Sequence, residues 1–532
     1  MEKPLPPAPV RDPAWLVAAA SRCAAAGDHR RALSLFEHAI ALAPGDAKAW
    51  AGAGLALQAL RRRGEAMAAL CRARLLDPTL APARTGIGNL LLERGLIGEA
   101  VAEFTAATEA APGWWIGWVN LGLALQHHGL PGEALTPLRQ ATRLAPDQPE
   151  AWHGLATALL LLDRLEEAEA ALRRVLSLDP RHAVAHSNLG RALRAGNRLD
   201  EARAAYHAAL AIAPDHAATR WNLAIADLLV GDWEAGWEGA EWRWRVPGFP
   251  SRPRGFAQPL WAGEPIEGRT LLLHAEQGYG DSLMMLRYLP LVAARGARPL
   301  LELPAPLLPL AAGLPAELVA AGAPLPDFDL HCPLLSLPRA FATRPETVPS
   351  TPYLAPPAES AARWAARLPA DGGLPRVGLA WAGRPTHGND ANRSIGLAAF
   401  APLLAMPGLR FYGLQAGPRA SDIAALGLAG LVEDLSPLLA DFGETAAALT
   451  RLDLLVSVDT SVAHMAGALG RPFRLLLPFA PDWRWMLGRE DTPWYPSGRL
   501  LRQARPGNWS APLAALAADL AQLVPTPAMA AE

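Results

Sequence analysis

The chain has 532 residues, more than one hydrophobic core usually supports, so we expect two to four domains. Hydrophobic residues make up 51% and charged residues 19%, a globular composition that excludes an intrinsically disordered chain. The formal net charge is only -2, so no overall basic field exists to attract nucleic acid.

Cysteine usage and hydropathy favour the cytoplasm. The three cysteines, Cys23, Cys71 and Cys332, are far apart and form no CxxC pair, which argues against a disulfide framework and a zinc site. Residues 1–15 hold no apolar stretch long enough for a signal peptide, and no uninterrupted 18-residue apolar run occurs anywhere. We therefore expect a cytoplasmic protein that does not span a membrane.

The N-terminal half is an array of 34-residue repeats. Prolines recur at a constant spacing of 34, at Pro44, Pro78, Pro112, Pro146, Pro180 and Pro214. Twelve residues before each proline is a small residue: Ala32, Ala66, Ala100, Ala134, Ala168 and Ala202. Eight residues before each proline is a bulky one: Phe36, Leu70, Phe104, Leu138, Leu172 and Tyr206. This register predicts two antiparallel helices per repeat, which approach closely at the small residues and end at the proline.

The pattern closely resembles the tetratricopeptide repeat and covers about residues 13–245. Such hairpins stack into a superhelix whose concave groove binds extended peptides or protein surfaces, so the resemblance implies protein partners. A degenerate seventh unit begins near Ala217 and runs into an aromatic cluster: Trp233, Trp237, Trp242 and Trp244. These tryptophans predict either a buried joint to the next domain or a simple capping helix.

Residues 246–268 are rich in proline and glycine and are predicted to be a linker. After them, short apolar runs alternate with helical stretches, which favours βαβ units and parallel sheets. We place a first lobe at 269–370, with strands at 270–274 and 298–303. Its other predicted parts are a helix at 282–294 and an irregular segment at 320–350.

A second lobe is placed at 371–525. Its predicted strands are 376–383, 409–415, 431–436, 454–460 and 473–478, and its last helix is 511–524. Two Rossmann-like lobes in series leave a cleft between the carboxyl ends of their strands. The predicted fold class is therefore α plus α/β, a repeat superhelix followed by a two-lobe domain.

The sharpest chemical motif is residues 452–472, LDLLVSVDTSVAHMAGALGRP. A buried strand ends at Val458, Asp459 and Thr460 form the turn, and a helix begins at about Ser461. The free N–H groups of that helix and the two hydroxyls suit a diphosphate. His464 lies one turn further on, and Gly467 allows close backbone approach. The alternative is that Asp459 and Thr460 only cap the helix.

This segment is similar to the donor-binding strand–turn–helix of the ADP-heptosyltransferase family, whose members have the two-lobe GT-B fold. Residues 269–525 resemble relatives that carry tetratricopeptide repeats in front, an architecture that also resembles the protein O-GlcNAc transferases. The resemblance implies that the motif holds the diphosphate of a nucleotide-sugar donor. That role is carried over to Asp459, Thr460, Ser461, His464 and Gly467.

The segment 381–397, WAGRPTHGNDANRSIGL, leaves the first strand of the second lobe and should overhang the cleft at Trp381. Arg393 and Ser394 suit a phosphate, because a guanidinium fork lies beside a hydroxyl. Relatives place a phosphate-binding basic residue in this loop, which supports Arg393; His387, Asn389 and Asp390 are secondary candidates in the same loop. The alternative is that Arg393 and Asp390 pair on the surface.

The turn EQGYGD, 276–281, follows the first strand of the first lobe. Gly278 and Gly280 permit a tight turn at the cleft, where an acceptor would enter, and Asp281 opens a helix that it could simply cap. The heptosyltransferase family has a Gly-Asp at the equivalent turn, and its aspartate is the proposed base that deprotonates the acceptor hydroxyl. The resemblance therefore implies Asp281 as the catalytic base, although the residues around it differ from those of the lipopolysaccharide enzymes.

Two lesser candidates lie in the second lobe. Gln415 ends its second predicted strand and could touch the nucleotide, and the aromatic-rich segment 478–496 either walls the base or sugar or packs as core. The sequence has no DxD carboxylate pair to bind a divalent cation, so cationic groups and a helix N-terminus would neutralise the leaving diphosphate. We expect neither a metal nor a cofactor.

The leading hypothesis is a metal-independent, inverting hexosyl- or heptosyltransferase that uses a nucleotide sugar as co-substrate. Its acceptor would be a glycan or a protein recruited by the repeats, such as a surface or flagellar component. One alternative is a repeat-based protein-binding scaffold whose glycosyltransferase-like domain is inactive. Another is a sugar-nucleotide epimerase with a related two-lobe fold.

Overall fold

The computed structural model of the protein describes residues 12–370 and 373–524. Residues 1–11, where we expect no signal peptide, and the domain limits at 371 and 525 lie outside the described residues. The described chain forms two compact units, which we describe separately. The first comprises residues 12–196 and 211–213, and the second comprises 197–210 and 214–524 with that same gap at 371–372.

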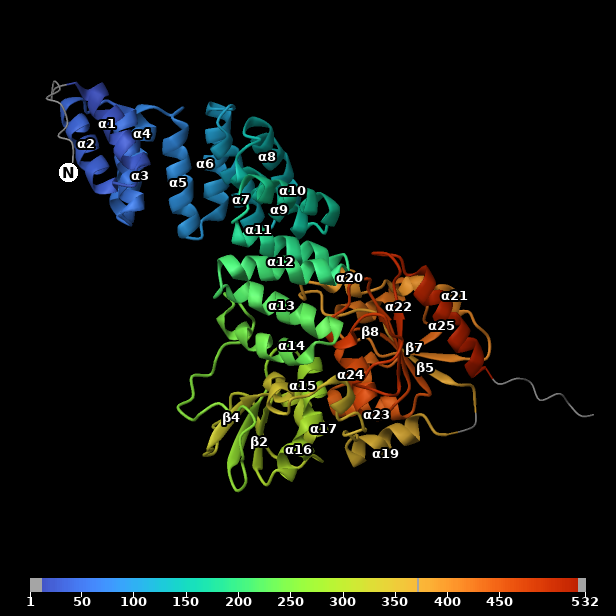
Figure 1. Ribbon diagram of the computed structural model, residues 1–532. Helices are drawn as coiled ribbons and strands as arrows, with labels where there is room; N and C mark the ends of the chain where they lie inside the picture. The colour runs from blue at the N-terminus through green and yellow to red at the C-terminus, as the bar shows by residue number, and fades with distance from the viewer. Residues whose placement is uncertain (1–11, 371–372, 525–532) are drawn as a thin grey trace, which may run out of the picture. The chain divides into compact units, whose positions relative to one another are not determined.

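The first unit is a series of helices joined by short turns (Figure 1). They are α1 (Pro13–Ala25), α2 (His29–Leu42), α3 (Ala47–Ala59), α4 (Arg63–Leu76), α5 (Ala81–Glu93), α6 (Ile97–Ala110), α7 (Trp115–His127), α8 (Pro131–Leu144), α9 (Pro149–Leu161), α10 (Leu165–Leu178) and α11 (Ala183–Ala195). Two helices fill each 34-residue period, and the second of each pair ends two residues before the periodic proline. The predicted helical hairpins are confirmed.

The repeat register also predicts the core correctly. All six alanines twelve residues before the prolines are fully buried, and the six bulky residues are at most 3% exposed. A Cβ added at Gly54 would lie 2.6 Å from Leu70 of the same hairpin, and one at Gly86 of the next hairpin would lie 2.8 Å from it. The bulky side chain therefore fills the space between successive hairpins, as the spacing predicts.

Each repeat proline also accepts a hydrogen bond that the sequence analysis does not anticipate. The side chain six residues after the proline donates to its carbonyl oxygen at 2.6–3.0 Å in every case. The donors are Trp50, Arg84, Trp118, Trp152, His186 and Arg220. Tryptophan, arginine and histidine share a ring or guanidinium N–H that reaches this carbonyl, which would otherwise remain open at the helix end.

Replacing Trp118 by phenylalanine is expected to lower the free energy of unfolding by about 0.5–1.5 kcal/mol, because it removes the 2.9 Å hydrogen bond to the Pro112 carbonyl but keeps an aromatic ring. Urea unfolding followed by circular dichroism measures the change. Trp115→Phe is the matched control, since no hydrogen bond of its indole is found among the described residues. Equal losses in the two variants would contradict the role of this bond.

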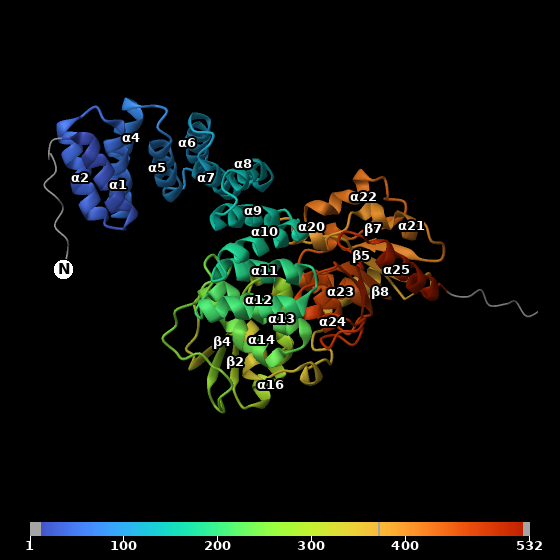
Figure 2. The same ribbon diagram turned by 45° about the horizontal axis from the view of Figure 1, so that its top comes forward.

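The second unit begins with the last helices of the array, α12 (Leu199–Ile212), α13 (Ala217–Val230) and α14 (Trp233–Ala240), and a 3-10 turn, η1 (Glu241–Arg245). Helices α13 and α14 pack side by side (Figure 2). The predicted seventh unit is therefore present. The last two residues of α12, with Ala213 after it, group with the first unit, so the boundary of the compact units falls within the repeat pattern.

The first lobe has a four-stranded parallel sheet in the order β3-β2-β1-β4. Its strands are β1 (Thr270–His274), β2 (Arg298–Leu303), β3 (Glu317–Ala320) and β4 (Leu330–Pro333). Its helices are α15 (Tyr279–Met285), α16 (Leu289–Ala294), α17 (Leu308–Ala311), α18 (Leu337–Ala340) and α19 (Ala358–Arg367). Strands β1 and β2 have the predicted bounds, whereas the predicted helix 282–294 is divided by a 3-10 turn at Leu286–Tyr288. The segment predicted to be irregular contains β4.

The second lobe has a six-stranded parallel sheet in the order β10-β9-β8-β5-β6-β7. Its strands are β5 (Arg376–Ala380), β6 (Arg410–Gly413), β7 (Val432–Asp434), β8 (Leu454–Val458), β9 (Phe473–Leu477) and β10 (Gly498–Arg502). Its helices are α20 (Asp390–Arg393), α21 (Ala401–Leu404), α22 (Asp422–Ala425), α23 (Phe442–Thr450), α24 (Ser461–Ala468) and α25 (Ser510–Leu523). The five predicted strands and the last helix are present, and β10 was not predicted.

In both sheets the candidate motifs follow strands at which the chain changes its direction across the sheet. In the second lobe the chain runs from β5 to one edge, returns to β8 beside β5, and then runs to the other edge. The carboxyl ends of β5 and β8 form the switch point, where open α/β sheets bind their ligands. In the first lobe the corresponding position is the carboxyl end of β1, where the turn 276–281 begins.

Candidate functional site

The start of α24 contacts the turn that follows β1 of the first lobe. A Cβ added at Gly280 would lie 2.9 Å from the His464 ring and 3.7 Å from the Ser461 Cα atom. Only a glycine allows this approach without displacing the imidazole. The motifs at 276–281 and 459–467 therefore meet between the two lobes, as the sequence predicts.

The first turn of α24 lacks a side-chain cap. Thr460 is the N-cap residue, and its side chain makes no capping hydrogen bond. Its hydroxyl instead lies 3.1 Å from the Ser457 hydroxyl, and no partner of the Ser461 hydroxyl is found in the described chain. The alternative that Asp459 and Thr460 merely cap this helix is wrong. Among the described residues no partner is found for the Ser461 and Val462 N–H groups, whereas the Ala463 N–H donates to the Thr460 carbonyl at 3.1 Å.

Asp281 is the third residue of the seven-residue helix α15. Its Oδ2 atom accepts a hydrogen bond of 2.9 Å from the Gly278 N–H. The alternative that Asp281 caps this helix is therefore confirmed. Its Oδ1 atom forms an ion pair with Arg484 of the second lobe. The carboxylate therefore both caps α15 and joins the two lobes.

Arg484 joins the candidate site although it is absent from the residues predicted for it. It lies in the 3-10 turn Trp483–Trp485, and its two terminal nitrogens pair with Asp281 and, at 2.6 Å, with Asp482. Burial opposes its charge, but Asp482 and Asp281 outweigh burial and raise the pKa of Arg484. The sequence offers one indication of it, an arginine two residues after Asp482. The segment 478–496 was interpreted only as an aromatic wall or as core.

Those aromatic residues form core rather than a wall open to a ligand. Trp483, Trp485, Trp494 and Tyr495 are between 0% and 6% exposed. Trp485 stacks on the His464 ring with the ring centroids 5.2 Å apart, and the Tyr495 hydroxyl lies 3.0 Å from His464 Nδ1. A Cβ at Gly467 would lie 2.3 Å from Tyr495, so Gly467 serves this packing.

His464 is 4% exposed and does not present its ring to solvent. Burial, followed by the nearby Arg484, lowers its pKa well below the ordinary value, so the imidazole is neutral at pH 7. Its Nε2 atom lies 3.9 Å from an Asp459 carboxylate oxygen. Burial, followed by repulsion from Asp482, raises the pKa of Asp459 to about 6.

Arg393 extends to the same group of residues from the loop after β5. Its charge lowers the pKa values of Asp459 and His464, which places it near both. Its Nε atom is buried without a hydrogen-bond partner and lies 3.6 Å from Asp390. The alternative of a pair with Asp390 is confirmed, but the pair is not on the surface, because the two side chains are only 16% and 7% exposed. Arg393 therefore keeps an unused donor near α24.

His387 of the same loop is exposed. Partial desolvation and then Arg393 lower its pKa, and Asp482, Asp390 and Asp281 oppose that shift, which places the imidazole among these charges. Its Nδ1 atom accepts a hydrogen bond of 3.2 Å from the Asn389 N–H. The imidazole is therefore a second titratable group beside Asp281.

Three predicted site residues have structural roles instead. The Ser394 hydroxyl accepts from the Gly383 N–H at 2.9 Å and donates to Asp390 at 2.8 Å, which shapes the loop. Gln415 joins the ends of β5 and β6, since its amide group bonds the backbone at 381, 382 and 416. Trp381 is fully buried and donates to Asp422 at 2.9 Å, so its prediction as a cleft residue is wrong.

The end of the repeat array supports both sides of this site. Arg243 of η1 forms two hydrogen bonds of 2.7 and 2.9 Å with Glu276, and both side chains are at most 2% exposed. Trp237 of α14 packs edge-on against Trp483 and donates to the Thr343 carbonyl at 2.8 Å. The predicted buried joint is confirmed, and it contacts the turn of Asp281 and the turn of Arg484.

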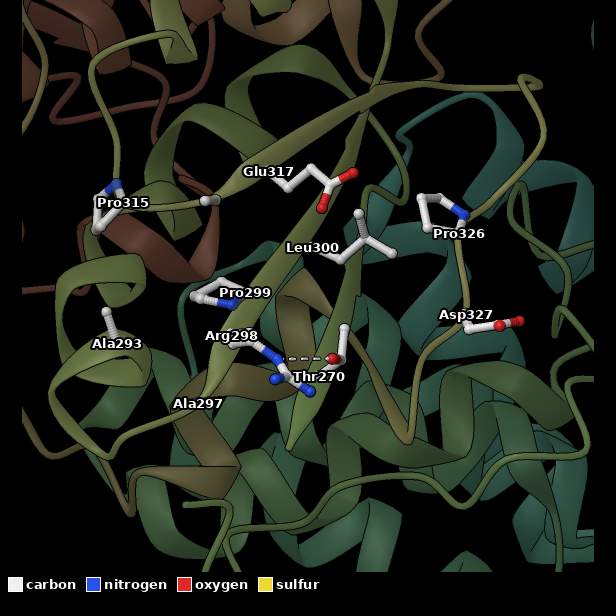
Figure 3. A pocket seen from close by; sticks show the side chains of 11 residues that line it. Thr270, Ala293, Ala297, Arg298, Pro299, Leu300, Pro315, Glu317, Pro326 and Asp327 are labelled. Carbon is white, nitrogen blue, oxygen red and sulfur yellow. Dashed lines mark hydrogen bonds between the residues drawn. The ribbon is translucent and has the colours of Figure 1, made fainter. Parts of the chain in front are cut away.

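A hollow of about 480 Å³ lies at the other end of the first sheet (Figure 3). It is lined by the starts of β2 and β3 and the segment at 326–327, and within it Arg298 donates to the Thr270 hydroxyl at 3.2 Å. Ligands of parallel sheets bind at the carboxyl ends of strands, whereas this hollow is at the amino ends. We do not assign it to the site.

Three tetratricopeptide-repeat families match the chain, at residues 85–149, 125–189 and 183–216. These residues are tetratricopeptide repeats. Repeats of this type form extended binding surfaces, which implies protein partners. No helix within residues 12–370 and 373–524 has the length and apolar character that crossing a bilayer requires. The described part of the chain also holds no group of three or more His, Cys, Asp or Glu residues suited to a metal ion.

The chain is 28% identical over 320 residues to protein FlbA of Caulobacter vibrioides, and the alignment covers 55% of this chain and 53% of FlbA. The match thus spans about half the length of that relative. Among solved structures, YrrB, a tetratricopeptide-repeat protein with an unusual peptide-binding site, is 27% identical. The alignment covers 35% of this chain and 95% of the YrrB chain, with a TM-score of 0.31. The protein TTC0263 of Thermus thermophilus is 26% identical, covering 34% of this chain and 100% of its own, with a TM-score of 0.29.

Proposed function

We propose that the second unit is a metal-independent glycosyltransferase of the GT-B type, which transfers a sugar from a nucleotide-sugar donor to a hydroxyl acceptor. The observation that carries the proposal is the uncapped start of α24, with Arg484 and the part-buried Arg393 near enough to shift the pKa values of Asp459 and His464 on either side of that start. Arginine forks and free helix N–H groups are the usual ligands of a diphosphate. The switch-point position of this group supports the same assignment.

In the proposed reaction, the acceptor oxygen attacks the anomeric carbon of the sugar while the bond from that carbon to the diphosphate breaks. The acceptor proton passes to Asp281, which faces α24 across the interlobe contact. The nucleoside diphosphate leaves with its charge neutralised by Arg393, Arg484 and the start of α24. Attack opposite the leaving group inverts the anomeric centre.

Titration calorimetry with ADP, UDP, GDP and dTDP tests the proposal. We expect at least one to bind the full chain, and Arg393→Gln to weaken that binding about tenfold or more, because a charge-assisted hydrogen bond is lost. Arg298→Gln, in the hollow of Figure 3, is the control and should leave the affinity unchanged. Failure of all four nucleotides to bind would instead favour the protein-binding scaffold, which the repeats support.

The raised pKa of Asp459 predicts how binding depends on pH. As the pH falls from 7 to 5, through the pKa of about 6, Asp459 gains a proton and one negative charge near the diphosphate is lost. Nucleotide affinity should therefore increase toward pH 5, relative to Asp459→Asn, in which this charge is absent at every pH. The difference between the two proteins isolates Asp459 from titration of the nucleotide. Parallel pH profiles would contradict the assignment.

A further inference from the structure

The two terminal nitrogens of Arg484 are already engaged. One pairs with Asp482, which is two residues away and also accepts the Arg484 backbone N–H at 3.1 Å. The other pairs with Asp281 of the opposite lobe. The guanidinium lies over the Trp483 ring with its central carbon 4.3 Å from the ring centroid. A diphosphate therefore cannot take the arginine fork unless one carboxylate leaves it.

Asp281 is the partner that can leave. Asp482 lies two residues from Arg484 and accepts its backbone N–H, so it stays beside the guanidinium. Asp281 lies on the short helix α15, after the turn at 276–278, and reaches Arg484 through Oδ1 alone, because its Oδ2 accepts the Gly278 N–H. Gln277 in that turn has a φ of 59°, a left-handed conformation that is costly for a residue other than glycine. The turn therefore has a strained backbone that a small rearrangement would relieve.

We propose that the Asp281–Arg484 ion pair is a latch, which the diphosphate of the donor opens by replacing Asp281 on Arg484. This inference rests on the proposed function and adds that donor binding determines when Asp281 can act as the base. With the latch closed, Asp281 Oδ1 is held by the guanidinium. With the donor bound, the oxygen is free to accept the acceptor proton, so that the base is available only when the donor is in place. Arg484 is then a catalytic residue that contacts the diphosphate.

A double-mutant cycle on binding tests the latch. The probes are inorganic pyrophosphate and the tightest-binding nucleoside diphosphate, titrated into wild type, Asp281→Asn, Arg484→Gln and the double variant. Asp281→Asn is expected to bind about fivefold more tightly or better, because the protein no longer has to break the ion pair before it binds. In the Arg484→Gln background the same substitution should change Kd less than twofold. Arg484→Met, which also removes the charge, replaces Arg484→Gln if the buried glutamine prevents folding, as judged by thermal unfolding.

The possible outcomes distinguish a failure of the latch from a failure of the proposed function. Equal tightening by Asp281→Asn in both arginine backgrounds, or no tightening at all, overturns the latch and leaves nucleotide binding standing. No binding of any probe by wild type or by Asp281→Asn overturns both. The predicted cycle with pyrophosphate, but no hydrolysis of any nucleotide sugar, supports the latch and overturns sugar transfer.

Discussion

Replacing Asp281 by asparagine is expected to lower the rate of sugar transfer by about 10²- to 10⁴-fold, the usual contribution of a general base. The amide oxygen can still accept the Gly278 N–H, so α15 keeps its cap and the variant should fold. Hydrolysis of the nucleotide sugar that binds best measures the effect without a known acceptor, because water also needs a base.

Asp327→Asn, in the hollow at the opposite end of the sheet, is the matched control and should retain the wild-type rate. An Asp281→Asn rate within threefold of wild type would exclude Asp281 as the base. His387, an exposed imidazole whose pKa the same charges shift, would then be the next residue to replace.

Replacing Arg243 by methionine is expected to lower the free energy of unfolding of the second unit by about 3–5 kcal/mol, because it leaves the Glu276 carboxylate buried without its partner. Chemical unfolding followed by tryptophan fluorescence measures the loss. The double variant Arg243→Met with Glu276→Gln should recover part of it, since the Glu276 charge is then gone, while Glu241, 16% exposed, still lacks its arginine partner.

Arg339→Met is the matched control for the methionine substitution, because Arg339 pairs with Glu238 where the two side chains are 33% and 70% exposed. An exposed pair contributes about 0–1 kcal/mol, so the control should change stability by no more than that. A loss for Arg243→Met as small as the control would mean that the buried pair does not hold the end of the repeats to the turn of Asp281.

The sequence predicts most of the fold, because its signals are local. The 34-residue register of prolines and small residues repeats often enough to define every hairpin, and the strands of both lobes are apolar runs bounded by turn residues. Strands β3 and β4 were missed because Glu317–Ala320 and Leu330–Pro333 are only four residues long, and β10 because Gly498–Arg502 carries two arginines. Propensity alone does not identify such strands; the pairing of β4 with β1 and of β10 with β9 stabilises them.

The candidate site was less predictable, because its contacts join distant segments. The turn at Asp459 and the loop of Arg393 follow strands and could be read from local pattern. The Asp281–Arg484 pair spans 203 residues, and no local feature links the two. Gln415 and Trp381 were misjudged for the opposite reason, since a polar or aromatic residue at a strand end can either face a ligand or fasten the loop.

A crystal structure of the protein with its tightest-binding nucleoside diphosphate tests the central claim most directly. The account predicts that the diphosphate oxygens lie within hydrogen-bonding distance of the Ser461 N–H and of the guanidinium groups of Arg393 and Arg484, with Asp281 released from Arg484. A nucleotide bound elsewhere, such as in the hollow beside Arg298, with the Asp281–Arg484 pair intact, would contradict it.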